Sequence, residues 1–136
     1  MESYGMKEVC SAVGISYETL KFYCNQGLVP NVKRDEKNRR RFDARDVEWL
    51  RSLMCLKKCG LGIEDMRMYM ELCLQGKRSI PQRREMLAER RNQLLDRMRE
   101  LEQCVAYIDG KRQFYNDVEA GRIAYVSNLL PKGEGV

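Results

Sequence analysis

The first 27 residues carry apolar side chains at helical spacing, interrupted by glycine. In the first segment these side chains recur at positions i, i+3, i+4 and i+7: Met6, Val9, Cys10 and Val13. This spacing predicts one short helix, which Gly14 ends. Ser16 then occupies the N-cap position of a second helix from 17 to 25, before Gly27. Two short helices joined by a glycine-containing turn are typical of a helix-turn-helix.

The stretch from residue 28 to 42 has a different pattern. Its first residues have extended character, and Pro30 disfavours a helix. A polar, turn-like run covers 35–38, and 39–42 has the character of a returning strand. We expect a β-hairpin with a charged tip.

Two further helices are predicted after the hairpin. Asp43 is a helix cap, and apolar residues at 47, 49, 50, 53, 54 and 56 lie on more than one side of the third helix. We therefore expect this helix to be the central packing helix of the domain, ending at Gly60. A fourth helix carries Ile63, Met66 and residues 70 and 73 on one face, and Gly76 ends it.

The second half of the chain predicts one long helix. Ser79 is the expected cap, followed by Pro81 in the first turn. Apolar residues recur every seven positions at Ile80, Leu87, Leu94, Leu101 and Ile108, and Met98 and Val105 fill a second row. This is a coiled-coil heptad pattern. Residues 80–116 would span roughly 55 Å as a helix. The chain contains no other helix of that length, so the expected partner is a second copy.

Composition narrows the function classes. The chain has 136 residues, with 25 Lys and Arg against 20 Asp and Glu. No apolar run approaches the roughly 20 residues needed to cross a bilayer. No signal-peptide pattern opens the chain, so we expect a cytoplasmic protein without a membrane partner. The six cysteines are then expected to be reduced thiols.

The pattern disfavours an enzyme. Histidine is absent, which removes the usual general base and the usual zinc ligand. The sequence has no glycine-rich phosphate loop and no Gly-x-Ser-x-Gly motif. We expect no catalytic site, no resident metal and no cofactor.

Several stretches resemble the MerR family of bacterial transcription regulators. They are Met6-Lys7-Glu8-Val9 with Gly14-Ile15-Ser16, Thr19-Leu20-Lys21-Phe22-Tyr23 with Gly27-Leu28-Val29-Pro30, Asn38-Arg39-Arg40-Arg41-Phe42, and Gly60-Leu61 with Ile63-Glu64-Asp65. Lys21 and Phe22 stand where Arg and Tyr are more usual. Within the family, residues 38–40, Trp49 and 55–57 resemble the branch that senses reactive aldehydes and nitrosative stress, the NmlR- and AdhR-like regulators.

The expected fold class is mainly α. It combines a winged helix-turn-helix, a small β-hairpin wing and a long dimerising antiparallel coiled-coil helix. We expect a DNA-binding domain with a helix-pair linker at 1–76, a dimerisation helix at 77–118 and a C-terminal tail at 119–136. The predicted dimerisation residues are Leu87, Leu94, Met98, Leu101, Val105 and Ile108.

The second helix of a helix-turn-helix reads the major groove with its N-terminal residues. The predicted base-reading residues are Ser16, Tyr17, Thr19 and Lys21, and we assign Tyr23 to a phosphate. The basic hairpin is expected to clamp the DNA backbone through Arg39, Arg40 and Arg41, although charged hairpins are often only solvated. The resemblance marks Arg40 as the chief wing contact. It further implies a homodimer on a palindromic promoter, which changes DNA twist so that RNA polymerase can engage.

Cys55 is the sensor candidate that the resemblance favours, because it falls between the DNA-binding unit and the coiled coil. Neighbouring Arg51, Lys57 and Lys58 would favour its thiolate. Cys59 lies one helical turn on. The competing interpretation is that both cysteines are small buried hydrophobes.

Two alternatives remain open. One is a metal-responsive regulator of the same family, in which Cys55 and Cys59 would need further thiol ligands. The other is a coiled-coil adaptor that binds no DNA. The adaptor hypothesis accounts for residues 79–118 and leaves the cap-and-turn pattern of residues 5–42 without a purpose.

Overall fold

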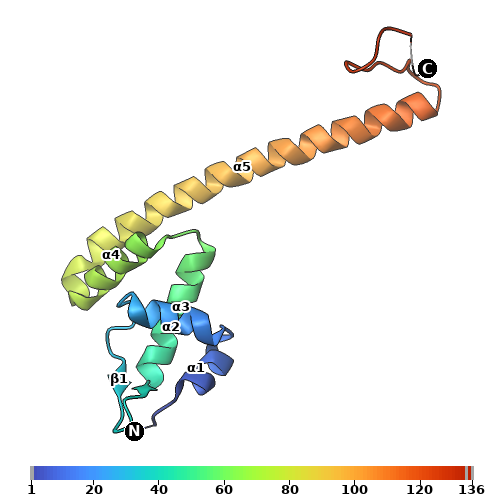
Figure 1. Cartoon of the computed structure of the whole chain (residues 1–136). Coiled ribbons are helices and arrows are strands. Elements are labelled where there is room, and N and C mark those ends of the chain that lie inside the picture. Colours follow the sequence, from blue (N-terminus) through green and yellow to red (C-terminus); the bar gives the residue numbers. More distant parts are fainter. Residues whose placement is uncertain (1, 134, 136) are drawn as a thin grey trace. The chain divides into compact units, whose positions relative to one another are not determined.

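The structure is a computed structural model that describes residues 2–133 and 135. The elements in chain order are α1 (Met6–Val13), α2 (Tyr17–Asn25), β1 (Lys33–Arg34), β2 (Arg40–Arg41), α3 (Ala44–Lys58), α4 (Ile63–Leu74), the 3₁₀ turn η1 (Gly76–Ser79) and α5 (Ile80–Glu119). The mainly helical fold with a two-stranded hairpin and a long C-terminal helix is confirmed (Figure 1). Positions 134 and 136 of the expected tail lie outside the described residues.

The chain forms two compact units, Met1–Arg91 and Asn92–Val136. The first unit holds the hydrophobic core, and α3 is its centre, as predicted. Leu50 and Leu53 of α3 are fully buried, together with Leu20 of α2 and Leu28 of the following loop. Figure 1 shows α1, α2 and the hairpin beside α3. The packing of these four elements fixes the position of the second helix, the expected reading helix.

Local capping explains why the short helices begin and end where they do. Ser16 accepts a hydrogen bond from the backbone N–H of Thr19, and Asp43 accepts one from that of Asp46. Both bonds satisfy N–H groups that a helix start leaves without partners. Gly14 ends α1 with a φ of 78°, in the left-handed region that favours glycine.

The hairpin is shorter than its sequence suggests. Each strand has two residues, and the register pairs Lys33 with Arg41 and Arg34 with Arg40. A further antiparallel bridge joins Tyr4 to Phe42, so the N-terminal segment extends the hairpin on its other side. The predicted extended residues 28 and 29 precede the strands and are buried in the core.

The expected cap of the long helix was wrong. Ser79 is fully buried and ends the 3₁₀ turn η1, which runs directly into α5. Its hydroxyl lies within hydrogen-bonding distance of the Leu72 and Gly76 carbonyl oxygens, and it accepts a hydrogen bond from Arg83. The 3₁₀ turn leads the chain directly into α5, and the Ser79 hydroxyl contacts Leu72 of α4 and Arg83 of α5. Ser79 therefore joins the end of α4 to the start of α5.

The second unit contains most of α5 and the segment after it. No α5 residue is fully buried. Among the predicted dimerisation residues, Met98, Leu101, Val105 and Ile108 are each about half exposed. A row of apolar side chains is therefore open along this helix.

Candidate nucleic-acid interface

The N-terminal part of α2 presents most of the predicted reading residues to solvent. Ser16, Tyr17 and Lys21 are exposed, and Thr19 is half-buried. The Ser16 hydroxyl donates to the Thr19 hydroxyl at 2.8 Å while it caps the helix. Ser16 thus orients Thr19, and the wider exposed surface belongs to Tyr17 and Lys21.

Tyr23 occupies a different environment from the other predicted contacts. Only 2% of its surface is exposed, and it belongs to the same cluster as Leu20 and Leu50. The assignment of Tyr23 to a phosphate therefore needs correction. In this structure Tyr23 packs the reading helix onto the core, because positions 20 and 23 lie on one helical face.

The three consecutive wing arginines contact three different parts of the first unit. Arg39 donates to Asp35 in the hairpin tip at 3.0 Å, and Arg40 donates to the Asn25 side-chain oxygen, at the end of α2, at 2.7 Å. Arg41 donates to the backbone oxygen of Ser3 at 2.8 Å. Arg40 therefore contacts α2, whereas its two neighbours contact the hairpin tip and the N-terminal segment. Arg40 thereby links the wing to the reading helix.

One hollow brings the wing and the reading helix together. Its volume is about 470 Å³. Tyr17 lines it together with all three wing arginines, and Lys7 and Arg34 line it as well. Sequence reasoning missed Lys7 as a site residue, whereas Arg34 belongs to the basic hairpin that was expected to clamp the DNA backbone. Five cationic side chains around one hollow suit the backbone phosphates of DNA.

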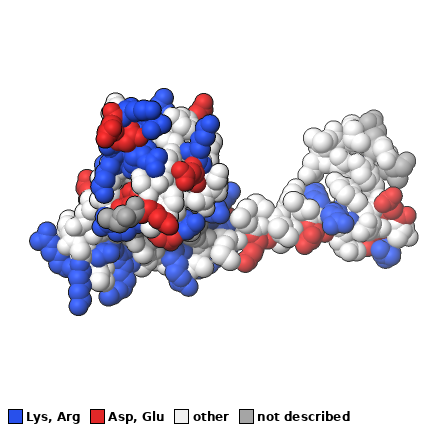
Figure 2. Space-filling model, turned by 90° about the horizontal axis from the view of Figure 1, so that it is seen from below, with Lys and Arg blue, Asp and Glu red and all other residues white. Residues whose placement is uncertain are grey.

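Positive charge is concentrated in the first unit. The excess of Lys and Arg over Asp and Glu lies entirely within residues 1–91. Figure 2 shows Lys and Arg side chains gathered over this unit, with several acidic groups among them. Positive charge that is clustered on one unit indicates a nucleic-acid interface. This distribution is more informative than the modest net charge of the chain.

Two carboxylates support the geometry of the wing. The backbone N–H of Arg39 donates to Asp35 and lowers the pKa of that carboxyl, with further help from the Arg39 side chain. The backbone N–H of Asp46 likewise lowers the pKa of Asp43, the cap of α3. Burial raises the pKa of Asp46. The hairpin tip and the start of α3 are thus both held by ionised acceptors at neutral pH.

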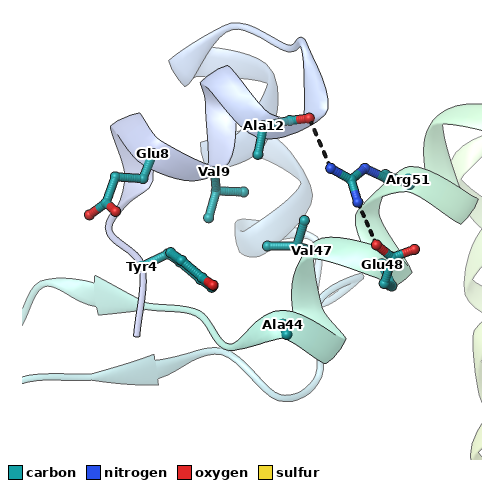
Figure 3. A pocket seen from close by; sticks show the side chains of 8 residues that line it. All are labelled: Tyr4, Glu8, Val9, Ala12, Ala44, Val47, Glu48 and Arg51. Carbon is teal, nitrogen blue, oxygen red and sulfur yellow. Dashed lines mark hydrogen bonds and ion pairs between the residues drawn. The ribbon is translucent and has the colours of Figure 1, made fainter. Parts of the chain in front are cut away.

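A second hollow lies between α1 and α3, with a volume of about 410 Å³ (Figure 3). Val9, Ala12 and Val47 line it, and Arg51 crosses from α3 to α1. Arg51 pairs with Glu48 and donates to the backbone oxygen of Ala12 at 3.3 Å. The Arg51 contacts therefore tie the first helix of the helix-turn-helix to the central helix.

The sensor candidates lie at the C-terminal end of α3. Cys55 is exposed and Cys59 is half-buried. The backbone N–H of Cys59 donates to the Cys55 carbonyl oxygen at 3.0 Å, so the two residues share one helical turn. Arg51, expected beside Cys55, is engaged with Glu48 and Ala12 instead. Within residues 2–133 and 135, no group of three or more Cys, Asp or Glu side chains is placed to hold a metal ion.

No helix in the described part of the chain is long and apolar enough to span a membrane.

An exposed reading helix, a basic hairpin beside it and a buried central helix define a winged helix-turn-helix DNA-binding protein. The chain belongs to the MerR family, because the model of the MerR HTH family regulatory protein matches residues 4–73. The resemblance seen in the sequence is confirmed. The chain is a DNA-binding transcription regulator and not an enzyme, which sets aside the adaptor hypothesis.

Individual relatives agree with this assignment. An uncharacterized HTH-type transcriptional regulator of Haemophilus influenzae is 32% identical over 118 residues, covering 87% of each chain. The HTH-type transcriptional regulator AdhR of Bacillus subtilis is 33% identical over 89 residues, which cover 65% of this chain and 64% of AdhR.

Solved structures share the fold. HiNmlR, described as a MerR family regulator lacking the sensor domain and bound to promoter DNA, has 32% identity and a TM-score of 0.72. The similarity covers 88% of this chain and 90% of HiNmlR. A MerR family regulator from Listeria monocytogenes has 28% identity and a TM-score of 0.73, covering 83% of this chain and 86% of that one.

Proposed function

We propose that the protein binds a palindromic promoter site as a homodimer and changes the twist of that DNA in response to a signal. The observation that carries this proposal is the open apolar row on α5. Leu101 and its neighbours are about half exposed on a helix that buries no residue of its own. Exposed apolar residues at heptad spacing are stabilised by a second helix of the same kind. Two copies then present two reading helices, which matches a two-fold symmetric site.

Apart from Tyr23, we propose the same reading and clamping residues that the sequence predicts, and the geometry described above supports them. Tyr17 and Lys21 reach base edges from the exposed side of α2, and Ser16 and Thr19 support them. The wing arginines hold the DNA backbone together with Lys7 and Arg34. The relative HiNmlR was solved on promoter DNA, which supports a promoter as the target. RNA polymerase is the expected further partner at such a site.

The dimer is tested by charge placed in the apolar row. Leu101→Lys puts a cation in the proposed seam, so we expect a monomer in sedimentation equilibrium, whereas the wild type is a dimer. Gln103→Lys is the control, since residue 103 is exposed and lies two positions from Leu101, off the seam. A wild-type monomer, or equal dimers in both variants, contradicts the proposed assembly.

The DNA target is tested by selection. Purified dimer is mixed with fragmented genomic DNA, and the bound fragments are sequenced. We expect a palindromic motif whose half-sites are about one helical turn or a multiple apart, since the two heads are related by a two-fold axis. Random duplexes are titrated beside the selected fragments at two salt concentrations. Equal affinity for both kinds of DNA contradicts specific recognition.

We propose Cys55 as the sensing thiol, with a reactive aldehyde or another thiol-directed stress compound as the signal. The side chain is exposed, and its turn of α3 directly precedes the connection to α4. Addition of the thiol to an aldehyde forms a sulfur–carbon bond, and the thiol proton moves to the former carbonyl oxygen. The adduct adds bulk at the end of the central helix.

Cysteine substitution tests this assignment. Cys55→Ser is expected to abolish the response of promoter output to formaldehyde and to leave DNA binding without the signal unchanged. Cys104→Ser is the matched control, because Cys104 is also exposed and lies on α5. Mass spectrometry locates the adduct. An unmodified Cys55 in protein that still responds contradicts the sensing role.

A further inference from the structure

One side chain of α5, that of Arg90, contacts the C-terminal end of α3. The Arg90 Nε–H donates to the backbone oxygen of Cys59 at 2.5 Å. Cys59 is the C-cap of α3, where carbonyl groups lack partners within the helix. An arginine at this position both fills that acceptor and complements the negative end of the helix dipole.

The neighbouring glycine makes room for this contact. Gly60 has a φ of 87°, and a Cβ built on it would lie 2.2 Å from the Arg90 Nη2 and 3.0 Å from its Cζ. The Arg90 guanidinium therefore lies against the Gly60 backbone, where no other residue fits without displacing it. The backbone N–H of Gly60 donates to the Lys57 oxygen at 2.9 Å, so Gly60 itself closes the last turn of α3.

Arg90 belongs to a stripe that fixes the start of α5 to the first unit. Arg83, Met86 and Arg90 fall at i, i+3 and i+7, on one helical face. Arg83 donates to the Gly76 oxygen at 2.7 Å, and Met86 packs against the hydrophobic core. The first unit ends at Arg91. Arg90 is thus the last of these contacts before α5 enters the second unit.

We propose that Arg90 is a positioning residue that couples the last turn of α3 to α5. The coupling rests on the proposed sensing by Cys55, whose carbonyl accepts the Cys59 N–H in that same turn. A change at Cys55 that shifts the turn moves the Cys59 oxygen. Because the guanidinium is confined between that oxygen and Gly60, it either follows and carries α5 with it or loses both contacts. The Arg90 guanidinium would thus have two alternative arrangements, one that keeps the contacts with α3 and one that loses them. An element with two discrete arrangements is what coupling between distant sites requires.

The test compares Arg90→Gln with Arg78→Gln, with no change to the remaining chain other than a shared Cys104→Ser substitution. Arg78 is exposed on η1, so the control removes the same charge. Each protein is alkylated with N-ethylmaleimide in a Cys104→Ser background, and its affinity for a duplex recovered by the genomic selection is measured. We expect alkylation to change the affinity at least about fivefold in wild type and Arg78→Gln, and less than about twofold in Arg90→Gln.

Three further measurements separate coupling from stability. Unmodified Arg90→Gln should keep wild-type affinity, and amide exchange at Gly60 and Leu61 should be faster than in Arg78→Gln. Arg90→Lys keeps a donor and a charge and should restore part of the response. Gly60→Ala should reproduce Arg90→Gln and add nothing to it in the double variant, because both disrupt the placement of the guanidinium against Gly60.

The proposal is overturned if alkylation changes the affinity of Arg90→Gln as much as that of wild type. It is also overturned if Arg78→Gln loses the alkylation response to the same extent as Arg90→Gln. If wild type itself does not respond, sensing by Cys55 fails, and amide exchange then decides on Arg90. Faster exchange at Gly60 in Arg90→Gln alone supports the link between α3 and α5, and equal exchange overturns it. If Arg90→Gln does not fold, the Arg90→Lys response decides: an unchanged amplitude overturns the proposal, and a reduced one supports it.

Discussion

Replacing Arg40 by alanine is expected to weaken binding to every DNA sequence. Arg40 lies in the hollow that joins the wing to the reading helix. Its hydrogen-bond partner is the neutral Asn25 side chain, and no carboxylate in the described part of the chain forms a salt bridge with it, whereas Arg39 is paired with Asp35. Arg40 is therefore available as a full positive charge for one phosphate, and its loss carries no change in base readout.

The size of the effect follows from counterion release. One phosphate contact contributes about 0.9 to the slope of log affinity against log salt. Over a fourfold rise in salt, such as about 50 to 200 mM, this corresponds to a three- to fourfold change in affinity. Arg40→Ala should bind DNA more weakly than wild type at low salt. This difference in affinity should become smaller by that factor as the salt concentration rises.

Fluorescence anisotropy of a labelled duplex, titrated at several salt concentrations, measures both slopes. Arg97→Ala is the control, because Arg97 is exposed on α5 and is paired with Glu100. Parallel lines for Arg40→Ala and wild type refute the reasoning, as does a deficit confined to the selected promoter sequence, since a phosphate contact acts on all sequences alike.

Two further predictions concern folding. Leu50→Ala removes a fully buried side chain from α3 and should lower the free energy of unfolding by about 2–5 kcal/mol in urea titrations at fixed protein concentration. Ser52→Ala is the control and should be nearly neutral, because Ser52 is exposed. A Leu50→Ala unfolding midpoint equal to that of wild type would show that α3 is not the core helix. The folded-state pKa of Asp35 is below its ordinary value of 3.8, so its contribution is present above that pH and is lost as pH falls through the folded-state pKa. The difference in melting temperature between wild type and Asp35→Asn should thus be larger at about pH 6 than at about pH 3, and a constant difference contradicts the assignment.

Much of the fold was predictable because its signals are local. Ser16 and Asp43 cap their helices through bonds that reach only three residues ahead, and Gly14 ends α1 by its own backbone angle. Such bonds depend on neighbours in sequence, so a pattern of cap and glycine suffices. Ser79 shows the limit of this reasoning: its sequence looks like a cap, but a preceding 3₁₀ turn directs the hydroxyl back to α4.

The site was less predictable because it is assembled across the chain. The pairing of Arg40 with Asn25 joins positions 15 residues apart, and no local pattern encodes it. Lys7 enters the hollow because the bridge between Tyr4 and Phe42 places the start of α1 beside the wing. Tyr23 is buried by helix packing. Because tyrosine has a polar tip on an apolar ring, its burial is difficult to predict from the sequence.

The three contacts of the wing arginines bear on the entropy cost of the proposed DNA binding. A loop that is free in solution loses conformational entropy when it is ordered on its target, and that loss weakens binding. Here the wing is already fastened to the hairpin tip, the reading helix and the N-terminal segment. In the proposed complex the wing is therefore already ordered before binding, and we expect most of the conformational adjustment to occur in the DNA duplex.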